Sequence, residues 1–229
     1  GRAPAGSAVM SDQPPVMLTE LELDALTELV NLGVGNAAVG LREMVKEEVL
    51  LSVPNVAIVT REQAIANLGR DPAKRLVAVH QNFDGDIRGR ALLIFPEAQS
   101  MELVRAVVGS DLSLEDLIEL EQEALAETGN VLLNSCLSTI ANSFGRTLRI
   151  SLPEVVHGDG SEFFNLTPWP QIDDSVLFIY INFAVRRGNI QGYLAMLLDL
   201  PSLVTLKELL ASYIARMGGT TPPAPSDAG

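Results

Sequence analysis

The chain has 229 residues, 47% of them hydrophobic and 20% charged, a balance that is typical of a globular protein and excludes a disordered or fibrous one. Its 16 Lys and Arg residues stand against 29 Asp and Glu, and the net charge of −13 argues against a nucleic-acid partner, which needs clustered cations. One cysteine and two histidines leave no disulfide framework and no ordinary Cys/His zinc site, which favours a reducing, cytoplasmic setting. No apolar run is long enough to predict a transmembrane helix, so we expect no membrane partner.

The first half of the chain predicts a long helix, a short helix and a closing helix, separated by strands. Residues 1–16, rich in Gly, Ala and Pro, are expected to be disordered. A helix should begin near Thr19, because Thr19 and Glu22 have capping-box spacing, and run to about Lys46. The segments expected next are a strand over 50–59, a short helix over 61–69, paired strands over 76–83 and 89–95, and a helix that opens at Pro96 and ends at Gly109.

The second half predicts the same elements in the same order. These are a helix over 114–144, strands over 149–156, 176–185 and 190–198, a helix opened by Pro201, and a disordered tail over 218–229. Three residues of the first half recur 99 positions later, since Glu28, Asn31 and Pro54 are followed by Glu127, Asn130 and Pro153. The sequence therefore predicts an α/β (α+β) fold built from a duplicated αβ(α)ββα unit. We expect its halves, about 17–110 and 111–217, to pack as one pseudo-symmetric domain.

Each long helix is predicted to have one polar and one apolar face. Glu28 and Asn31 share a sector of the first helix, and Glu127 and Asn130 share a sector of the second. A single Glu-x-x-Asn pair usually marks a solvated face, but Asn is a mediocre helix former, and its recurrence in both halves indicates either a function or helix–helix bonding. Cys136 falls on the apolar side and is predicted to be a core residue.

Three glycines, Gly33, Gly35 and Gly129, lie beside these pairs and are expected to let the backbone of a partner approach closely. A carboxamide can accept a hydrogen from a water molecule and aim the lone pair of that water without bringing negative charge to a phosphoryl group. A neighbouring Glu can pair with a lysine of a partner and so fix the orientation of the complex.

These residues carry a resemblance to the CheC/CheX/FliY family of chemotaxis phosphatases over about residues 17–217. The family pattern is Asp or Ser, three residues, Glu, two residues, Asn, 22 residues, Pro. The first copy matches it in full through Asp24, Glu28, Asn31 and Pro54. The second copy matches through Glu127, Asn130 and Pro153, but Glu123 stands where Asp or Ser is usual.

The resemblance implies a phosphatase that hydrolyses the aspartyl phosphate of a CheY-type response regulator. In the family the motif Asn, here Asn31 and Asn130, orients the attacking water. The motif Glu, here Glu28 and Glu127, engages the invariant lysine of the regulator. The resemblance further implies that the two motif helices share one surface, that the required magnesium belongs to the regulator, and that this chain binds no cofactor or metal. Asp24 and Glu123 are weaker candidates for partner contact.

Two alternatives remain open. The protein could be a non-catalytic module that binds the receptor deamidase CheD or forms part of the flagellar switch. A FliY-like switch protein would need a further C-terminal domain, which is not expected after the last predicted helix. The protein could instead hydrolyse small phosphoesters with Glu28 and Glu127 as a general acid/base pair, but no phosphate-cradling cluster of Lys or Arg supports this.

Overall fold

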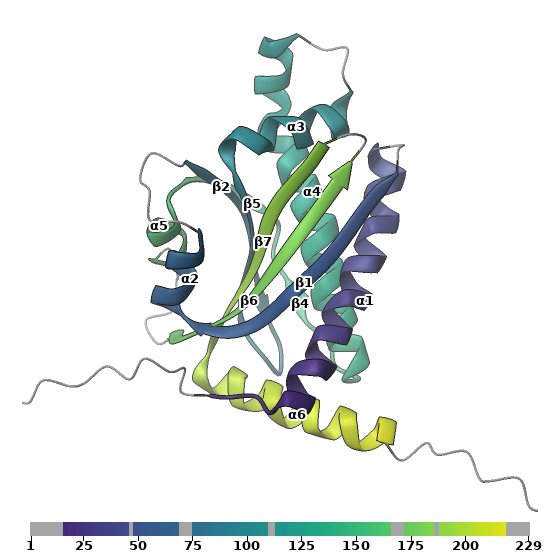
Figure 1. The fold of residues 1–229 in the computed structure, drawn as a ribbon, viewed down its shortest axis with the longest axis vertical. Helices are drawn as coiled ribbons and strands as arrows, with labels where there is room; N and C mark the ends of the chain where they lie inside the picture. Colours follow the sequence, from purple (N-terminus) through teal and green to yellow (C-terminus); the bar gives the residue numbers. More distant parts are fainter. Residues whose placement is uncertain are drawn as a thin grey trace, which may run out of the picture.

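Two long helices, α1 (Glu20–Val45) and α4 (Leu114–Ser143), lie side by side against one face of a curled antiparallel sheet (Figure 1). This computed structural model describes residues 16–45, 48–68, 75–109, 113–165, 172–185 and 188–218. The segments predicted to be disordered, 1–16 and 218–229, lie outside the described residues except for their inner ends, Val16 and Gly218.

The described elements follow the predicted order twice along the chain. The first half continues after α1 with β1 (Val49–Thr60), α2 (Arg61–Leu68), β2 (Leu76–Asp84), β3 (Gly89–Pro96) and α3 (Glu97–Val108). The second half continues after α4 with β4 (Arg149–Ile150), β5 (Glu154–Gly158), α5 (Gly160–Asn165), β6 (Ile172–Val185), β7 (Gly188–Asp199) and α6 (Leu200–Gly218). The duplicated αβ(α)ββα unit is confirmed.

Capping boxes start both long helices. The Oε2 atom of Glu22 accepts a hydrogen bond from the Thr19 amide at 2.7 Å, and the Thr19 hydroxyl accepts one from the Glu22 amide at 3.3 Å. Ser113 and Asp116 make the equivalent pair of bonds at the start of α4. Amide groups that the helix itself leaves without acceptors are thereby satisfied, so both helices begin where the sequence predicts.

The strand order reproduces the internal symmetry. It runs β1-β6-β7-β3-β2-β4, with β5 also paired to β2, and every described pairing is antiparallel. Exchanging each strand for its counterpart in the other half reverses this order and leaves the neighbours unchanged. A pseudo-two-fold axis therefore passes between the central strands β3 and β7, where Leu93 is paired with Leu194.

The two motif prolines both occupy irregular positions on the outer strands of the sheet. In the pairing of β1 with β6, the register shifts between Ser52 and Asn55, on either side of Pro54. In the second half, the predicted strand over 149–156 is wrong as a single element. It is split into β4 and β5 at residues 151–153, because Pro153 has no amide hydrogen to donate and one extra residue bulges out at this point.

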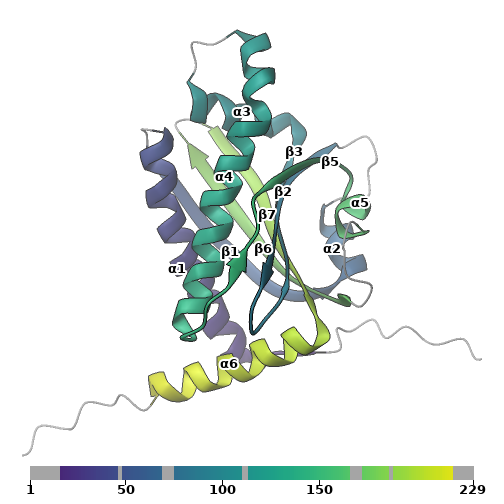
Figure 2. The ribbon, with the colours of Figure 1, turned by 180° about the vertical axis from the view of Figure 1, so that it is seen from behind.

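The core fills both faces of the sheet, and alternate residues of each strand point to opposite sides. On the face covered by α1 and α4, β2 contributes Val77 and Val79, whereas Leu76 and Ala78 belong to a smaller cluster on the other face. Figure 2 shows α2 and α5 on that second face, and α3 and α6 at opposite ends of the molecule.

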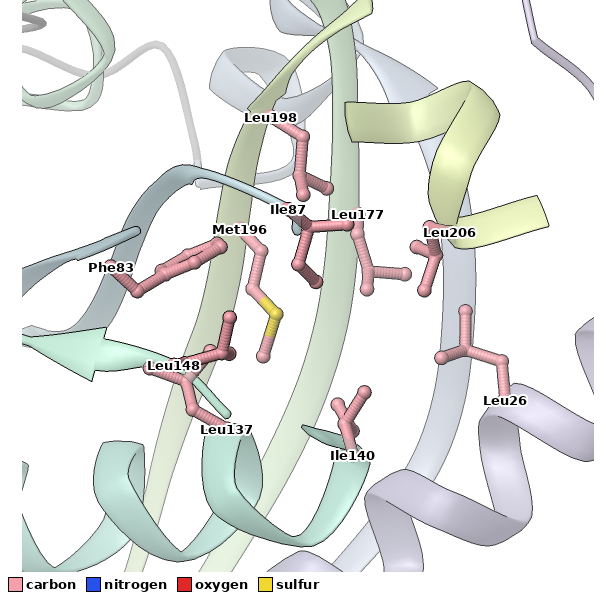
Figure 3. A pocket seen from close by; sticks show the side chains of 10 residues that line it. All are labelled: Leu26, Phe83, Ile87, Leu137, Ile140, Leu148, Leu177, Met196, Leu198 and Leu206. Atoms are coloured by element: carbon pink, nitrogen blue, oxygen red, sulfur yellow. The ribbon is translucent and has the colours of Figure 1, made fainter. Parts of the chain in front are cut away.

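Near α6, the main core encloses a void of only about 10 Å³ that is lined wholly by apolar side chains, among them Leu26, Phe83 and Met196 (Figure 3). A void of this size and polarity is a packing gap rather than a ligand site.

Candidate functional site

The outward face of α1 carries the first predicted pair. Glu28 and Asn31 are both exposed, whereas Leu29 and Gly33 on the opposite side are buried. This burial pattern confirms the predicted two-faced helix. Among the described residues, the side chains of Glu28 and Asn31 make no hydrogen bond or ion pair.

The second pair lies on α4 in a different environment. Glu127 is exposed, but Asn130 is half-buried on the side of α4 that lies next to β2. The Oδ1 atom of Asn130 accepts hydrogen bonds from Nε2 of Gln81 at 3.1 Å and from Nδ2 of Asn134 at 2.7 Å. The same Nε2 of Gln81 donates to the carbonyl oxygen of Ser151 at 2.8 Å.

Gln81 is the residue that sequence reasoning missed. Its side chain is buried, with 1% exposed. The contact with Asn130 spans 49 positions of the chain, so no local pattern reveals it. The available signal was Gln81 on the same face of the predicted strand 76–83 as the apolar Val77 and Val79, because a buried polar side chain in a strand needs a partner.

Close packing at glycines sets the positions of both helices. A Cβ atom on Gly33 would lie 2.8 Å from the Cα atom of Cys136, and one on Gly129 would lie 2.4 Å from a methyl carbon of Val79. Gly33 thus allows α1 to touch α4, and Gly129 allows α4 to touch β2. Nothing lies within 4 Å of the corresponding point on Gly35. The predicted close approaches at Gly33 and Gly129 are therefore internal.

The two helices run antiparallel. A Cβ on Gly33 would approach Cys136, whereas one on Gly40, further along α1, would approach Val131, further back on α4. With a rise of 1.5 Å per residue, Glu28 and Glu127 then lie about 20 Å apart along the helix pair. A general acid and a general base must both reach one substrate, and in glycosidases the two carboxyl groups are about 5–9.5 Å apart. Glu28 and Glu127 are therefore too far apart to act as one acid/base pair.

The weaker candidates, Asp24 and Glu123, are both exposed one turn before the motif glutamates. Among the described residues, neither side chain makes a hydrogen bond or an ion pair, so neither is tied to Glu28 or Glu127. Their contact with a partner stays a prediction.

The fold leaves Cys136 inside the core and brings no metal-binding cluster together among the described residues. Cys136 is fully buried, and burial raises the pKa of its thiol to about 12, so it is a core residue as predicted. Within the described ranges, no group of three or more His, Cys, Asp or Glu side chains is arranged to hold a metal ion.

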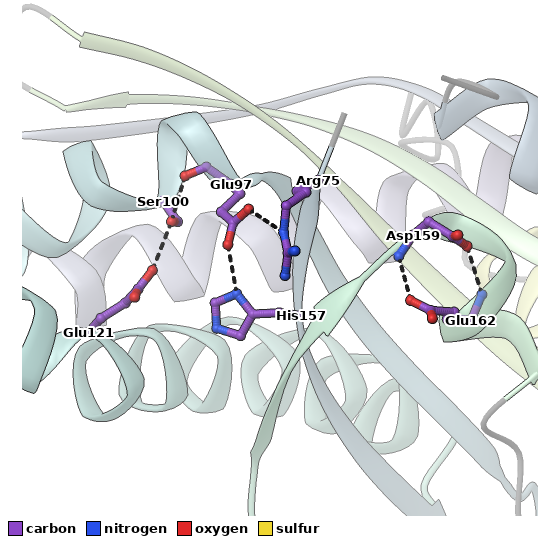
Figure 4. A network of polar contacts seen from close by, with 7 residues as sticks. All are labelled: Arg75, Glu97, Ser100, Glu121, His157, Asp159 and Glu162. Carbon is purple, nitrogen blue, oxygen red and sulfur yellow. Dashed lines mark hydrogen bonds and ion pairs between the residues drawn. The ribbon is translucent and has the colours of Figure 1, made fainter. Parts of the chain in front are cut away.

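A second hollow, of about 700 Å³, opens between the start of α3 and the end of α2. Its cation, Arg75, is paired with Glu97 at 2.9 Å, and His157 contacts the other oxygen of the same carboxylate at 3.2 Å (Figure 4). The carboxylate of Glu97 lies beside this guanidinium and would repel a phosphate, so the hollow does not form a ready phosphate cradle.

Sequence and structure comparisons place this architecture among chemotaxis proteins. A profile of the family described as "Chemotaxis phosphatase CheX" matches residues 77–165. The CheY-P phosphatase CheC of Bacillus subtilis is 27% identical over 141 residues, which cover 60% of this chain and 67% of CheC. The flagellar motor switch phosphatase FliY of the same organism is 24% identical over 213 residues, covering 90% of this chain but only 54% of FliY.

Among solved structures, FliY of Thermotoga maritima shares the fold, with a TM-score of 0.67 and 19% identity, over 86% of this chain and all of that one. The sequence resemblance to the CheC/CheX/FliY family is thereby confirmed, and the chain has a CheC-like fold. None of the helices in the described residues combines the length and apolar character that crossing a membrane requires.

Proposed function

We propose that this protein hydrolyses the aspartyl phosphate of a CheY-type response regulator in chemotaxis signalling. The observation that carries this proposal is the recurrence of a Glu-x-x-Asn pair on two adjacent helices. Glu28, Asn31 and Glu127 are exposed, and Asn130 is half-buried. The relative CheC, which is named a CheY-P phosphatase, supports the same assignment. Because the chain spans only about half the length of the relative FliY, the activity of that whole protein is not carried over.

In the proposed reaction, the oxygen of a water molecule forms a bond to phosphorus while the bond between phosphorus and the aspartyl oxygen breaks. The carboxylate of the regulator leaves with the electron pair, inorganic phosphate is released, and the water proton passes to the phosphate or to solvent. The carboxamide of Asn31 accepts a hydrogen of that water and aims its lone pair at phosphorus. Such acceleration is positioning, and misplacement by about 1 Å can cost about 100-fold.

Glu28 and Glu127 have a different role in the proposal. Each carboxylate pairs with a lysine of the regulator and so fixes the orientation in which the amide enters the active site. The magnesium that neutralises the phosphoryl oxygens is held by the regulator. This chain then supplies an amide and a carboxylate and binds no metal of its own.

The hydrolysis of small phosphoesters is disfavoured by two observations. Glu28 and Glu127 are separated by about 20 Å along the antiparallel helices, which is too far for a shared substrate. The guanidinium of Arg75 beside the second hollow is already paired with Glu97.

A non-catalytic role remains the competing proposal, because one relative is named a flagellar motor switch phosphatase. In that case the same helix face would bind a switch component or a CheD-type deamidase without turnover.

The test is phosphate release from a CheY-type regulator phosphorylated with acetyl phosphate, in the presence and absence of this protein. A parallel reaction contains p-nitrophenyl phosphate and no regulator. We expect faster loss of phosphate from the regulator and no release of nitrophenol. Release of nitrophenol would support a small-phosphoester hydrolase, and binding to the regulator without acceleration would support the non-catalytic module.

A further inference from the structure

The two halves of the molecule differ at equivalent buried residues of β2 and β6. In β2, Gln81 lies opposite the break between β4 and β5, between the paired positions Phe83/Ile150 and His80/Glu154. In β6, Ile181 lies opposite the bulge at Pro54, between the paired positions of Asn182 and Tyr180. Both side chains are buried, with 1% and 0% exposed. The pseudo-two-fold axis therefore relates a hydrogen-bonding glutamine to an isoleucine that has no polar group.

The residues that directly precede the two motif asparagines also differ, and this difference too favours a contact with the sheet in the second half. Gly129 precedes Asn130, and its missing side chain lets α4 approach Val79 on β2. The equivalent residue 99 positions earlier is Val30, a buried valine that precedes Asn31. The second helix thus sits close enough to β2 for Gln81 to reach the motif amide, and the structure gives Asn31 no such partner among the described residues.

The orientation of the second amide follows from a backbone group. The carbonyl oxygen of Ser151 can only accept, so the Gln81 atom that lies 2.8 Å from it must be the amide nitrogen. That nitrogen also lies 3.1 Å from Asn130, which must therefore present its oxygen. Asn134 donates to the same oxygen at 2.7 Å. Because a carbonyl oxygen has two lone pairs, the acceptor of Asn130 is fully used and only its Nδ2 hydrogens remain for a partner.

We propose that the two motif amides are chemically unequal, and that Gln81 is a positioning residue that holds Asn130 with its acceptor engaged. The hydrogen-bond difference between the two amides does not depend on the proposed function, but its effect on turnover does. Asn31 keeps a free acceptor for the hydrogen of the attacking water and carries most of the turnover. Asn130 contributes as a donor alone, toward an oxygen of the water or of the phosphoryl group. The break in the strand at Pro153 contributes to this arrangement, because it leaves the carbonyl oxygen of Ser151 available to accept a hydrogen bond from Gln81.

The catalytic test uses Gln81→Met. Methionine has about the length of glutamine and suits a buried position, but it has no hydrogen-bond donor. In an Asn31→Ala background, where only the second site remains, freeing the acceptor of Asn130 should raise turnover about tenfold, the equivalent of about 1.4 kcal/mol for one neutral hydrogen bond. The gain should disappear when Asn130 is also replaced by alanine. An unchanged or lower turnover in the Asn31→Ala background would overturn the proposal. A melting curve of each variant shows whether it is folded.

A second readout does not depend on phosphatase activity. The side-chain amide signals of Asn130 in a ¹H–¹⁵N correlation spectrum, assigned by their loss in Asn130→Ala, should move in Gln81→Met, whereas those of Asn31 should stay in place. Unmoved Asn130 signals would refute the contact itself. If the signals move but no variant accelerates dephosphorylation, the hydrogen-bond difference between the halves stands and the proposed function fails.

Discussion

The close approach of α4 to β2 predicts a large effect from adding one methyl group at Gly129. In Gly129→Ala, the new Cβ would lie 2.4 Å and 2.6 Å from the Cγ1 and Cβ atoms of Val79. Val79 is buried in the sheet and, as a β-branched residue, has little rotamer freedom, so α4 has to move. Overpacking of this kind costs about 1–3 kcal/mol, while replacing a helical Gly by Ala gains about 1 kcal/mol.

Gly35→Ala is the matched control, because Gly35 is also inside a long helix but has nothing within 4 Å of its would-be Cβ. It should stabilise the protein by about 1 kcal/mol. The helix-propensity gain is common to both variants, so the difference between their unfolding free energies isolates the packing cost of about 1–3 kcal/mol. Urea unfolding of the three proteins measures it, and melting temperatures should separate by about 2–4 °C per kcal/mol. Equal stabilisation by both substitutions would refute the close packing of α4 on β2.

Three further predictions follow from single groups. Burial raises the pKa of the Cys136 thiol to about 12, so Cys136 should not react with a thiol reagent at pH 8 until denaturant unfolds the chain. Rapid labelling of the native protein would contradict its burial. Burial, aided by Arg90, lowers the pKa of His80 below 6.5, so the unfolded chain takes up the proton first and stability should fall as the pH drops through about 6.5. His80→Gln should flatten that loss in urea titrations, and an unchanged slope would count against a neutral His80. Ser113→Ala removes the cap of α4 and should cost about 1 kcal/mol in thermal unfolding, whereas no change would show that α4 does not need it.

The helices and the repeat could be predicted from the sequence because their signals are local. Thr19 with Glu22 marks the start of α1, and apolar periodicity predicts its end within a residue or so. The exposure of Glu28 and Asn31 also follows from periodicity alone. A 99-residue offset then transfers each prediction to the second half.

The rest depends on contacts between residues that are distant in sequence. The strand order was not predicted, because antiparallel pairing of β3 with β7 joins residues about a hundred positions apart. The predicted strand over 149–156 failed at Pro153, where a bulge interrupts the pairing with β2. The hydrogen bond from Gln81 to Asn130 was missed for the same reason, and with it the difference between the two sites.

The proposed role of the two amides is tested most directly by the rate at which a phosphorylated CheY-type regulator loses its phosphate. The rate is measured with the wild-type protein, Asn31→Ala, Asn130→Ala and the double variant. Each protein is also titrated for binding to the regulator. We expect Asn31→Ala to lose more activity than Asn130→Ala, and the double variant to lose acceleration while binding persists. Retained turnover in the double variant would contradict the proposal that these amides position the attacking water.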